Sequence, residues 1–277
     1  MSEIQSCEAS IDGINFRLKE PFDFSFLKKY GQVFKVLDNQ DSGNICFGVE
    51  DSRYKYFIKF AGAPTVRANL NEEEAIATLK NTIQIYRDLA HPILARLINA
   101  EEIGGGFAAV FEWVDAICMG RQYQQEHQQF MALPLVTRTK IFEEIMAFHV
   151  HMAAQGYVAI DFYDGSIMYS QPDSRTIICD IDFYSKAPYT NQMGRLWGSG
   201  LFMSPEEFTL GAEIDEVTNI YVMGATAFAL LSGYDRTPEK WPLDMRLYNV
   251  VKQATSDKRE ERQQSIRQLI KEWEAAK

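Results

Sequence analysis

The first part of the chain alternates short hydrophobic runs with clusters of polar turn residues, a pattern typical of β-strands. Between Ile14 and Gly62, two extended runs lie on either side of the polar cluster at 38–43. A third run, at 54–60, alternates with period two. We therefore expect an antiparallel meander over residues 14–62.

A helical pattern follows the meander. Residues 69–74 combine asparagine caps with acidic residues of a first turn, which predicts a helix at about 70–90 that ends before His91. Apolar residues recur at the spacing of one helix face, namely Ala75, Leu79, Ile83 and Tyr86. Two more strands are expected at 94–103 and 107–114, with a glycine turn between them.

The second part of the chain has mainly helical periodicity. Apolar residues at spacings of three and four predict helices within 135–155, 218–233 and 259–276, and a loop-rich stretch lies at 156–206. The sequence therefore predicts an α+β chain. A small antiparallel β-rich lobe with one helix (1–111) precedes a short link (112–116) and a larger, mainly helical lobe (117–277).

Composition narrows the classes of partner. The 277 residues include 28 Lys and Arg against 38 Asp and Glu, a net charge of -10, and no basic block is present, which argues against nucleic acid. No apolar run reaches the roughly 18 residues of a membrane helix, and the N-terminus lacks signal-peptide features. The four cysteines are far apart and form no CxxC pair. We expect a cytoplasmic protein that binds neither membrane nor nucleic acid.

Four features stand in the order of the protein-kinase signature set. They are Lys59 on a predicted strand, Asp161 in a loop, Asp182-Phe183-Tyr184, and Ser204-Pro205-Glu206. Over residues 30–273 the chain thus resembles the protein kinase-like superfamily, and within it a divergent bacterial serine/threonine protein kinase. The resemblance implies a bilobal kinase fold that uses ATP with Mg²⁺ or Mn²⁺. It also implies transfer of the γ-phosphoryl group to a hydroxyl, that of Ser or Thr in a protein substrate.

The resemblance assigns nucleotide-binding roles in the first lobe. Lys59 corresponds to the lysine that binds the α- and β-phosphates and is also part of the catalytic set. Gly43 and Ile45 resemble the last glycine and the valine of GxGxxGxV. Phe111 stands in the gatekeeper place. In the link between the lobes, which corresponds to the kinase hinge, Glu112 offers its backbone carbonyl to adenine, and Val114 offers its backbone N–H and carbonyl.

In the second lobe, Asp161 is the candidate catalytic base, which orients the attacking hydroxyl and accepts its proton. Asp182 is the candidate ligand for the metal ion between the β- and γ-phosphates. Ser166 replaces the asparagine that binds a second ion, and Asp164 is an alternative ligand.

The resemblance also implies structural roles for four residues. Glu206 is expected to pair with Arg262. Ser199 stands in the usual threonine place, and Asn219 replaces the aspartate that holds the catalytic loop.

Several positions depart from the kinase pattern. Asp38 and Gln40 stand where two loop glycines are usual, and Thr82 stands where a helix glutamate pairs with the strand lysine. Glu74 is either the replacement for that glutamate or a solvated capping residue. Two alternatives therefore remain: a pseudokinase that acts as a nucleotide-binding scaffold, and a small-molecule kinase. The sequence identifies neither the physiological substrate nor the oligomeric state.

Overall fold

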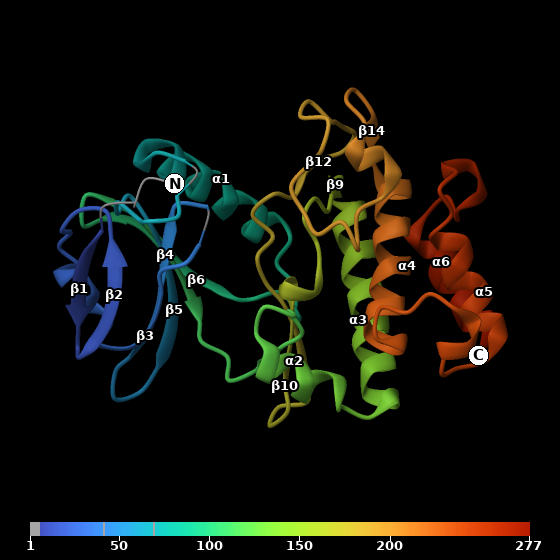
Figure 1. Ribbon diagram of the computed structural model, residues 1–277, viewed down its shortest axis with the longest axis horizontal. Helices are drawn as coiled ribbons and strands as arrows, with labels where there is room; N and C mark the ends of the chain where they lie inside the picture. The colour runs from blue at the N-terminus through green and yellow to red at the C-terminus, as the bar shows by residue number, and fades with distance from the viewer. Residues whose placement is uncertain (1–5, 41, 69) are drawn as a thin grey trace. The chain divides into compact units, whose positions relative to one another are not determined.

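The computed structural model describes residues 6–40, 42–68 and 70–277. Three parts of the expectations lie outside these residues: the N-terminal segment 1–5, Asp41 of the turn cluster, and Asn69 at the expected helix start. The described chain mixes α and β structure, with a five-stranded antiparallel sheet and six α-helices (Figure 1). Among the described residues, no helix is long and apolar enough to cross a membrane.

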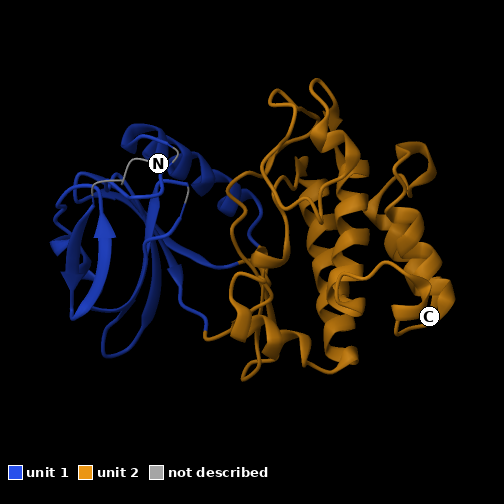
Figure 2. Cartoon of the chain, in the orientation of Figure 1, with its two compact units in different colours: residues 1–90, 95–114 blue, residues 91–94, 115–277 orange. Residues whose placement is uncertain are grey.

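The chain divides into two compact units (Figure 2). Unit 1 consists of residues up to 90 together with 95–114, and unit 2 consists of 91–94 and 115–277. Unit 1 contains the five-stranded sheet and the first helix. The other α-helices of the described chain belong to unit 2.

The sheet of unit 1 has the spatial order β3-β4-β5-β7-β6, and all neighbouring strands are antiparallel. The strands are β3 (Gln32–Leu37), β4 (Asn44–Glu50), β5 (Lys55–Ala61), β6 (Leu97–Ile103) and β7 (Gly106–Glu112). The expected meander is confirmed as β3, β4 and β5. A separate hairpin, β1 (Cys7–Ile11) with β2 (Ile14–Leu18), adds a first strand that the sequence pattern did not predict.

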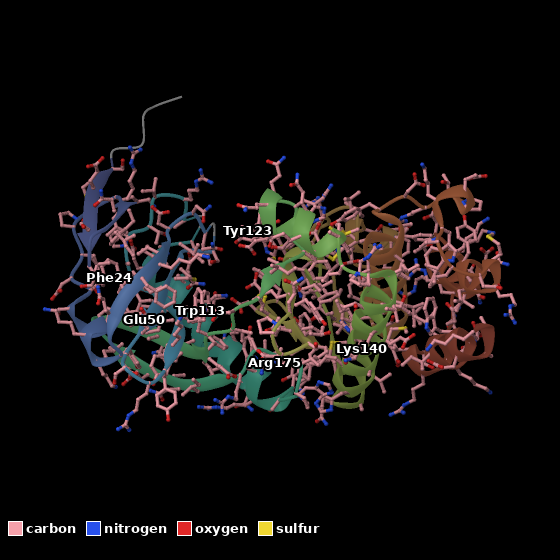
Figure 3. The ribbon with its side chains drawn as sticks, turned by 90° about the horizontal axis from the view of Figure 1, so that it is seen from below. Phe24, Glu50, Trp113, Tyr123, Lys140 and Arg175 are labelled. Atoms are coloured by element: carbon pink, nitrogen blue, oxygen red, sulfur yellow. The ribbon has the colours of Figure 1, made fainter. Side chains whose placement is uncertain are left out.

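Strand alternation gives the sheet of unit 1 two different faces. One face carries an apolar core, to which Phe47, Ile58 and Phe60 contribute fully buried side chains. Phe24, labelled in Figure 3, lies in this core, with its ring 5.1 Å from Phe47 and 6.1 Å from Phe60 between centroids. These aromatic contacts bury large apolar areas and hold the sheet against the segments that precede it.

The other face of the sheet carries helix α1 (Glu72–Asp88). Asn71 caps this helix, since its Oδ1 accepts the backbone N–H of Glu74. The predicted apolar stripe is buried as expected, and the ring of Tyr86 lies 4.8 Å from that of Phe111 on β7. Local capping and periodicity therefore predicted both ends and the buried side of α1.

Unit 2 is built around α3 (Leu135–Ala154) and α4 (Glu216–Ser232), which lie side by side in Figure 1. Nearly every residue of α4 is buried, because α3, α5 (Met245–Ala254) and α6 (Ile266–Ala276) all contact it. Helix α2 (Gln124–Met131) was not predicted, since Phe130 is its only buried residue and its other positions are mostly polar.

The last helix begins later than predicted. Residues 259–261 form a short 3-10 turn, and α6 begins at Ile266 because Ser265 caps it by accepting the N–H of Gln268. Other 3-10 turns lie at Ser25–Lys29, Asp164–Ser166, Pro205–Phe208 and Pro238–Lys240.

The stretch expected to be rich in loops contains short antiparallel ladders. β9 (Tyr157–Val158) pairs with β12 (Ser185–Lys186), and β13 (Tyr189–Thr190) pairs with β14 (Glu213–Ile214). A three-stranded sheet has the order β11-β10-β8, formed by β8 (Ile117–Cys118), β10 (Ile167–Ser170) and β11 (Arg175–Ile178). These ladders determine where the candidate site residues of unit 2 lie.

Candidate functional site

Asp161, the candidate base, and Asp182, the candidate metal ligand, lie on segments that extend from the same end of one short ladder. Val158 on β9 pairs with Ser185 on β12 in antiparallel register. Asp161 follows Val158 by three residues, and Asp182 precedes Ser185 by three. Because the paired strands run in opposite directions, these two segments extend side by side from the same end of the ladder. The β9–β12 ladder thus brings together the two segments that carry Asp161 and Asp182.

A second ladder attaches Ser166 to the segment that leads to Asp182. Ile167 pairs with Ile178, and the N–H of Cys179 donates to the carbonyl of Ser166 at 3.0 Å. The Ser166 side chain is fully buried, and its Oγ has no hydrogen-bond partner among the described residues. A buried hydroxyl without a partner is costly, so such groups commonly face a ligand, an ion or water.

Asp161 occupies an unusual backbone conformation, with φ of 62° and a half-buried side chain. Its Oδ1 would lie 3.5 Å from a Cβ placed on Gly198, whose φ is 137°. The segment around Gly198 therefore passes close to the Asp161 carboxylate. A left-handed φ at a residue other than glycine is a strained feature that often occurs at functional sites.

Asn219 contacts the loop that precedes Asp161, as its place in the sequence predicts. The N–H of Ala159 donates to Asn219 Oδ1 at 3.2 Å. Asn219 is fully buried on α4, and its Nδ2 has no hydrogen-bond partner among the described residues. The amide oxygen thus joins the central helix of unit 2 to the loop, while the two N–H donors of Nδ2 remain available.

The predicted ion pair between Glu206 and Arg262 is confirmed. Arg262 donates from Nη1 to Oε1 at 2.7 Å and from Nη2 to Oε2 at 3.0 Å, and both side chains are buried. Burial alone would raise the pKa of Glu206, but the hydrogen bonds from Arg262 lower it below its usual value. Arg259 also donates to Glu206, at 2.8 Å. The role of Arg259 was not predicted from the sequence, although this residue lies on the same charged segment as Arg262.

Ser199 contributes through its backbone. Its carbonyl accepts the N–H of Phe202 at 2.9 Å, while its hydroxyl makes no hydrogen bond with a described residue. Ser199 therefore shapes the turn that follows Gly198.

Asp164 has structural partners that disfavour its alternative role as a metal ligand. Its Oδ2 accepts the hydroxyl of Tyr234 at 2.7 Å and the Nε of Arg121 at 3.3 Å. The carboxylate is only 3% exposed. A metal ion at this oxygen would compete with both partners, so Ser166 remains the better candidate.

In unit 1, Lys59 lies on β5, the central strand of the sheet. It pairs with Cys46 on β4 and with Ala109 on β7, so these three side chains share one face. Phe111 lies on the same face, where it is buried against Tyr86 of α1. Lys59 is half-buried on the face that α1 covers.

Ile45 does not lie beside Lys59, so its predicted nucleotide-binding role is wrong. It pairs with Phe60 and is fully buried in the apolar core, on the face opposite to Lys59. Successive strand residues point to opposite faces, so a displacement of one position exchanges the faces. Cys46, rather than Ile45, is the β4 residue beside Lys59.

The packing of α1 explains why residue 43 is a glycine. Its φ is 80°, and a Cβ at this position would lie 3.0 Å from the Cβ of Ala75 on α1. A side chain here would be strained by the backbone and crowded by the helix. The close approach of α1 thus accounts for this glycine without a nucleotide.

Glu74 behaves as a capping residue. Its carboxylate accepts the N–H of Asn71 at 3.0 Å, which completes a capping box at the start of α1. Thr82, at the place of the usual glutamate, is buried and donates its hydroxyl to the carbonyl of Thr78 at 3.0 Å. The buried side of α1 therefore presents no carboxylate.

The link after β7 includes Val114, whose backbone makes no hydrogen bond with a described residue. The N–H of Glu112 donates to Arg96, and that of Trp113 donates to Lys55. Val114, the last residue of unit 1, takes part in no such bond through its N–H or carbonyl. Its backbone N–H and carbonyl are therefore not used by the described residues, and the role in adenine binding stays a prediction.

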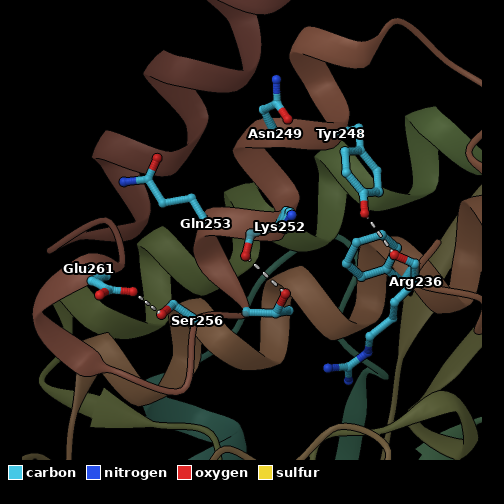
Figure 4. Close-up of a pocket in the computed structure, with 9 residues that line it drawn as sticks. Arg236, Tyr248, Asn249, Lys252, Gln253, Ser256 and Glu261 are labelled. Carbon is cyan, nitrogen blue, oxygen red and sulfur yellow. Dashed lines mark hydrogen bonds between the residues drawn. The ribbon is translucent and has the colours of Figure 1, made fainter. Parts of the chain in front are cut away.

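A hollow of about 520 Å³ lies elsewhere in unit 2 (Figure 4). Arg236, Tyr248, Asn249 and Lys252 are among its lining residues. The Tyr248 hydroxyl donates to the carbonyl of Arg236 at 2.9 Å. None of the site residues predicted from the sequence lines this hollow.

No preformed metal cage is found in residues 6–40, 42–68 and 70–277, where no three His, Cys, Asp or Glu side chains are grouped to hold an ion. No protein-family model matches the sequence, and no curated protein matches it.

Proposed function

We propose that this protein is a phosphotransferase with a bilobal, protein-kinase-like fold that moves the γ-phosphoryl group of ATP to a hydroxyl. The acceptor class that fits best is Ser or Thr of a protein. The observation that carries the proposal is the β9–β12 ladder, from whose one end the segments of Asp161 and Asp182 extend. The buried, unpaired hydroxyl of Ser166 supports it.

The residues present fit a magnesium nucleotide. Mg²⁺ keeps several waters and is usually bound by one or two carboxylates together with phosphate oxygens, so a full protein cage is not needed. In this proposal Asp182 and Ser166 bind the ion or ions, which neutralise charge on the phosphates. Asp161 orients the acceptor hydroxyl and takes its proton. Lys59 supplies a cation to the phosphates.

A nucleotide-binding scaffold without turnover is the second candidate. It is favoured by two departures from the kinase pattern on α1: Glu74 caps the helix, and a buried Thr82 stands where the helix glutamate is usual. The Glu206–Arg262 pair favours a protein kinase over a small-molecule kinase, because the latter generally lacks this segment and its arginine.

The test is phosphoryl transfer from γ-labelled ATP, with Mg²⁺ or Mn²⁺, to the protein itself and to generic protein substrates. Asp161→Asn should abolish labelling because it removes the base. Asp173→Asn is the matched control, since Asp173 is exposed in the turn after β10 and should leave labelling unchanged. Equal labelling by the wild type and Asp161→Asn would refute the role of Asp161.

Nucleotide binding separates the enzyme from the scaffold. Mg²⁺-ATP should raise the melting temperature of the wild type and of Asp161→Asn, while Asp182→Asn should lose the Mg²⁺-dependent part of this shift. Binding without labelling would favour the scaffold. A shift that Asp182→Asn leaves unchanged would remove Asp182 from the site.

A further inference from the structure

Three sulfur-containing side chains share one face of the β11-β10-β8 sheet in unit 2. Cys118 on β8 pairs with Met168 on β10, and Met168 pairs with Ile177 on β11. Cys179 follows Ile177 by two residues, and its N–H continues the ladder by donating to the carbonyl of Ser166. Ladder partners share a face, and so do residues two apart on a strand. Cys118, Met168 and Cys179 therefore lie on one face although they are far apart in the sequence.

The distances show that these sulfur atoms converge. Cys179 Sγ lies 3.7 Å from Met168 Sδ. Cys118 Sγ and Cys179 Sγ lie 3.6 Å and 3.8 Å from one atom, the carbonyl oxygen of Gly165. The two thiols can be no farther apart than these two distances together, and the thioether is in contact with one of them.

The surroundings of this sulfur cluster favour a cation. Glu126 accepts the N–H of Cys118 at 2.9 Å. The pKa of the Cys118 thiol is raised to about 12, mainly by burial and to a smaller extent by the negative charges of Glu126, Asp164 and Asp180. The same negative charges attract a metal ion, and a bound ion reverses the effect because it deprotonates a coordinating thiol.

The cluster is also accessible. Cys118 is 7% exposed, while Met168 and Cys179 are half-buried. A small ion can thus reach the thioether and one thiol from solvent, and can then engage the more buried thiol by rotation of its side chain.

We propose that Cys118, Met168 and Cys179 form a binding site for a soft monovalent metal ion of the cuprous class. Thiolate and thioether sulfurs are soft ligands that select Cu(I), whereas structural zinc sites use four Cys or His ligands. Binding forms bonds from the ion to the two thiolates and the thioether, each thiol releases its proton to solvent, and no electron is transferred. The ion would tie β8, β10 and β11 together. The proposed phosphotransferase activity is not needed for this ion to bind.

The experiment uses the full chain, reduced and anaerobic, titrated with Cu(I) in competition with the chelator bathocuproine disulfonate. A Cys7→Ser/Cys46→Ala background leaves only the two cysteines of the cluster. This background should hold one Cu(I) per chain. Adding Cys118→Ser or Cys179→Ser should weaken the affinity by at least about tenfold, the scale of losses seen when metal sites are altered.

Met168→Leu tests the thioether with little change of volume. It should weaken Cu(I) binding, while Met223→Leu, at a fully buried methionine of α4, should not. Circular dichroism checks that each variant folds. The proposal is overturned if the background protein fails to compete with the chelator, if either serine variant keeps its affinity, or if Met168→Leu and Met223→Leu bind equally. X-ray absorption of the bound copper should show a sulfur shell, and a nitrogen or oxygen shell would contradict the site.

Discussion

Removal of Arg262 should destabilise unit 2 strongly, because its guanidinium is fully enclosed. It makes two hydrogen bonds to Glu206, and it also donates to the carbonyls of Ser256 at 2.7 Å and Val217 at 3.2 Å. Removing one partner of a buried ion pair lowers the free energy of unfolding by about 3–5 kcal/mol, because the other charge stays buried without its partner. Arg259 still contacts Glu206, so we expect about 3 kcal/mol for Arg262→Ala, near the lower limit.

The assay is urea unfolding followed by circular dichroism. With a slope of about 2 kcal/mol per molar urea, this loss lowers the midpoint by about 1.5 M. Arg246→Ala is the matched control, since this arginine is 63% exposed in its pair with Asp244 and should leave the midpoint nearly unchanged. A midpoint that moves equally little in Arg262→Ala would refute the reasoning.

Two further predictions concern stability. Gly43→Ala should cost about 1–2 kcal/mol in urea unfolding, because the φ of 80° and the Ala75 Cβ both oppose a side chain. A Cβ at Gly200 would make only an ordinary contact, 3.9 Å from Phe208 Cζ, so Gly200→Ala should be nearly neutral, and an equal effect of the two changes would contradict this. Burial lowers the pKa of His149 to about 4 from 6.5, so the unfolded chain binds a proton that the native chain does not, and stability falls as pH falls through this window. The free energy of unfolding should fall by about 3 kcal/mol between pH 6.5 and pH 4, and this loss should disappear in His149→Phe. Unfolding at several pH values measures the loss, and an unchanged pH dependence in the variant would contradict the prediction.

Local signals were sufficient to predict α1 and the meander. The capping residues, the acidic first turn and the apolar stripe of α1 all lie within one segment of sequence, so no distant contact is needed to recognise them. The ion pair of Glu206 and Arg262 was predicted instead from the resemblance to the protein-kinase pattern, since nothing local connects residues so far apart.

Features that depend on register or on very short strands were not predictable. β9 and β12 have two residues each, too few for any periodicity, although their pairing brings the segments of Asp161 and Asp182 together. The face of Ile45 depends on the register between β4 and β5, which the sequence pattern alone left open. The sulfur cluster arises only when β8 and β11 flank β10.

The central claim is that the segments of Asp161 and Asp182 surround one nucleotide-bound metal ion. Fe²⁺ can substitute for Mg²⁺ with ATP, and with ascorbate and peroxide it cleaves the backbone beside the site where it is bound. The account predicts ATP-dependent cuts in both segments, at 161–166 and at 180–184, which mass spectrometry would locate. Cuts confined to one of these segments, or cuts that do not require ATP, would contradict it.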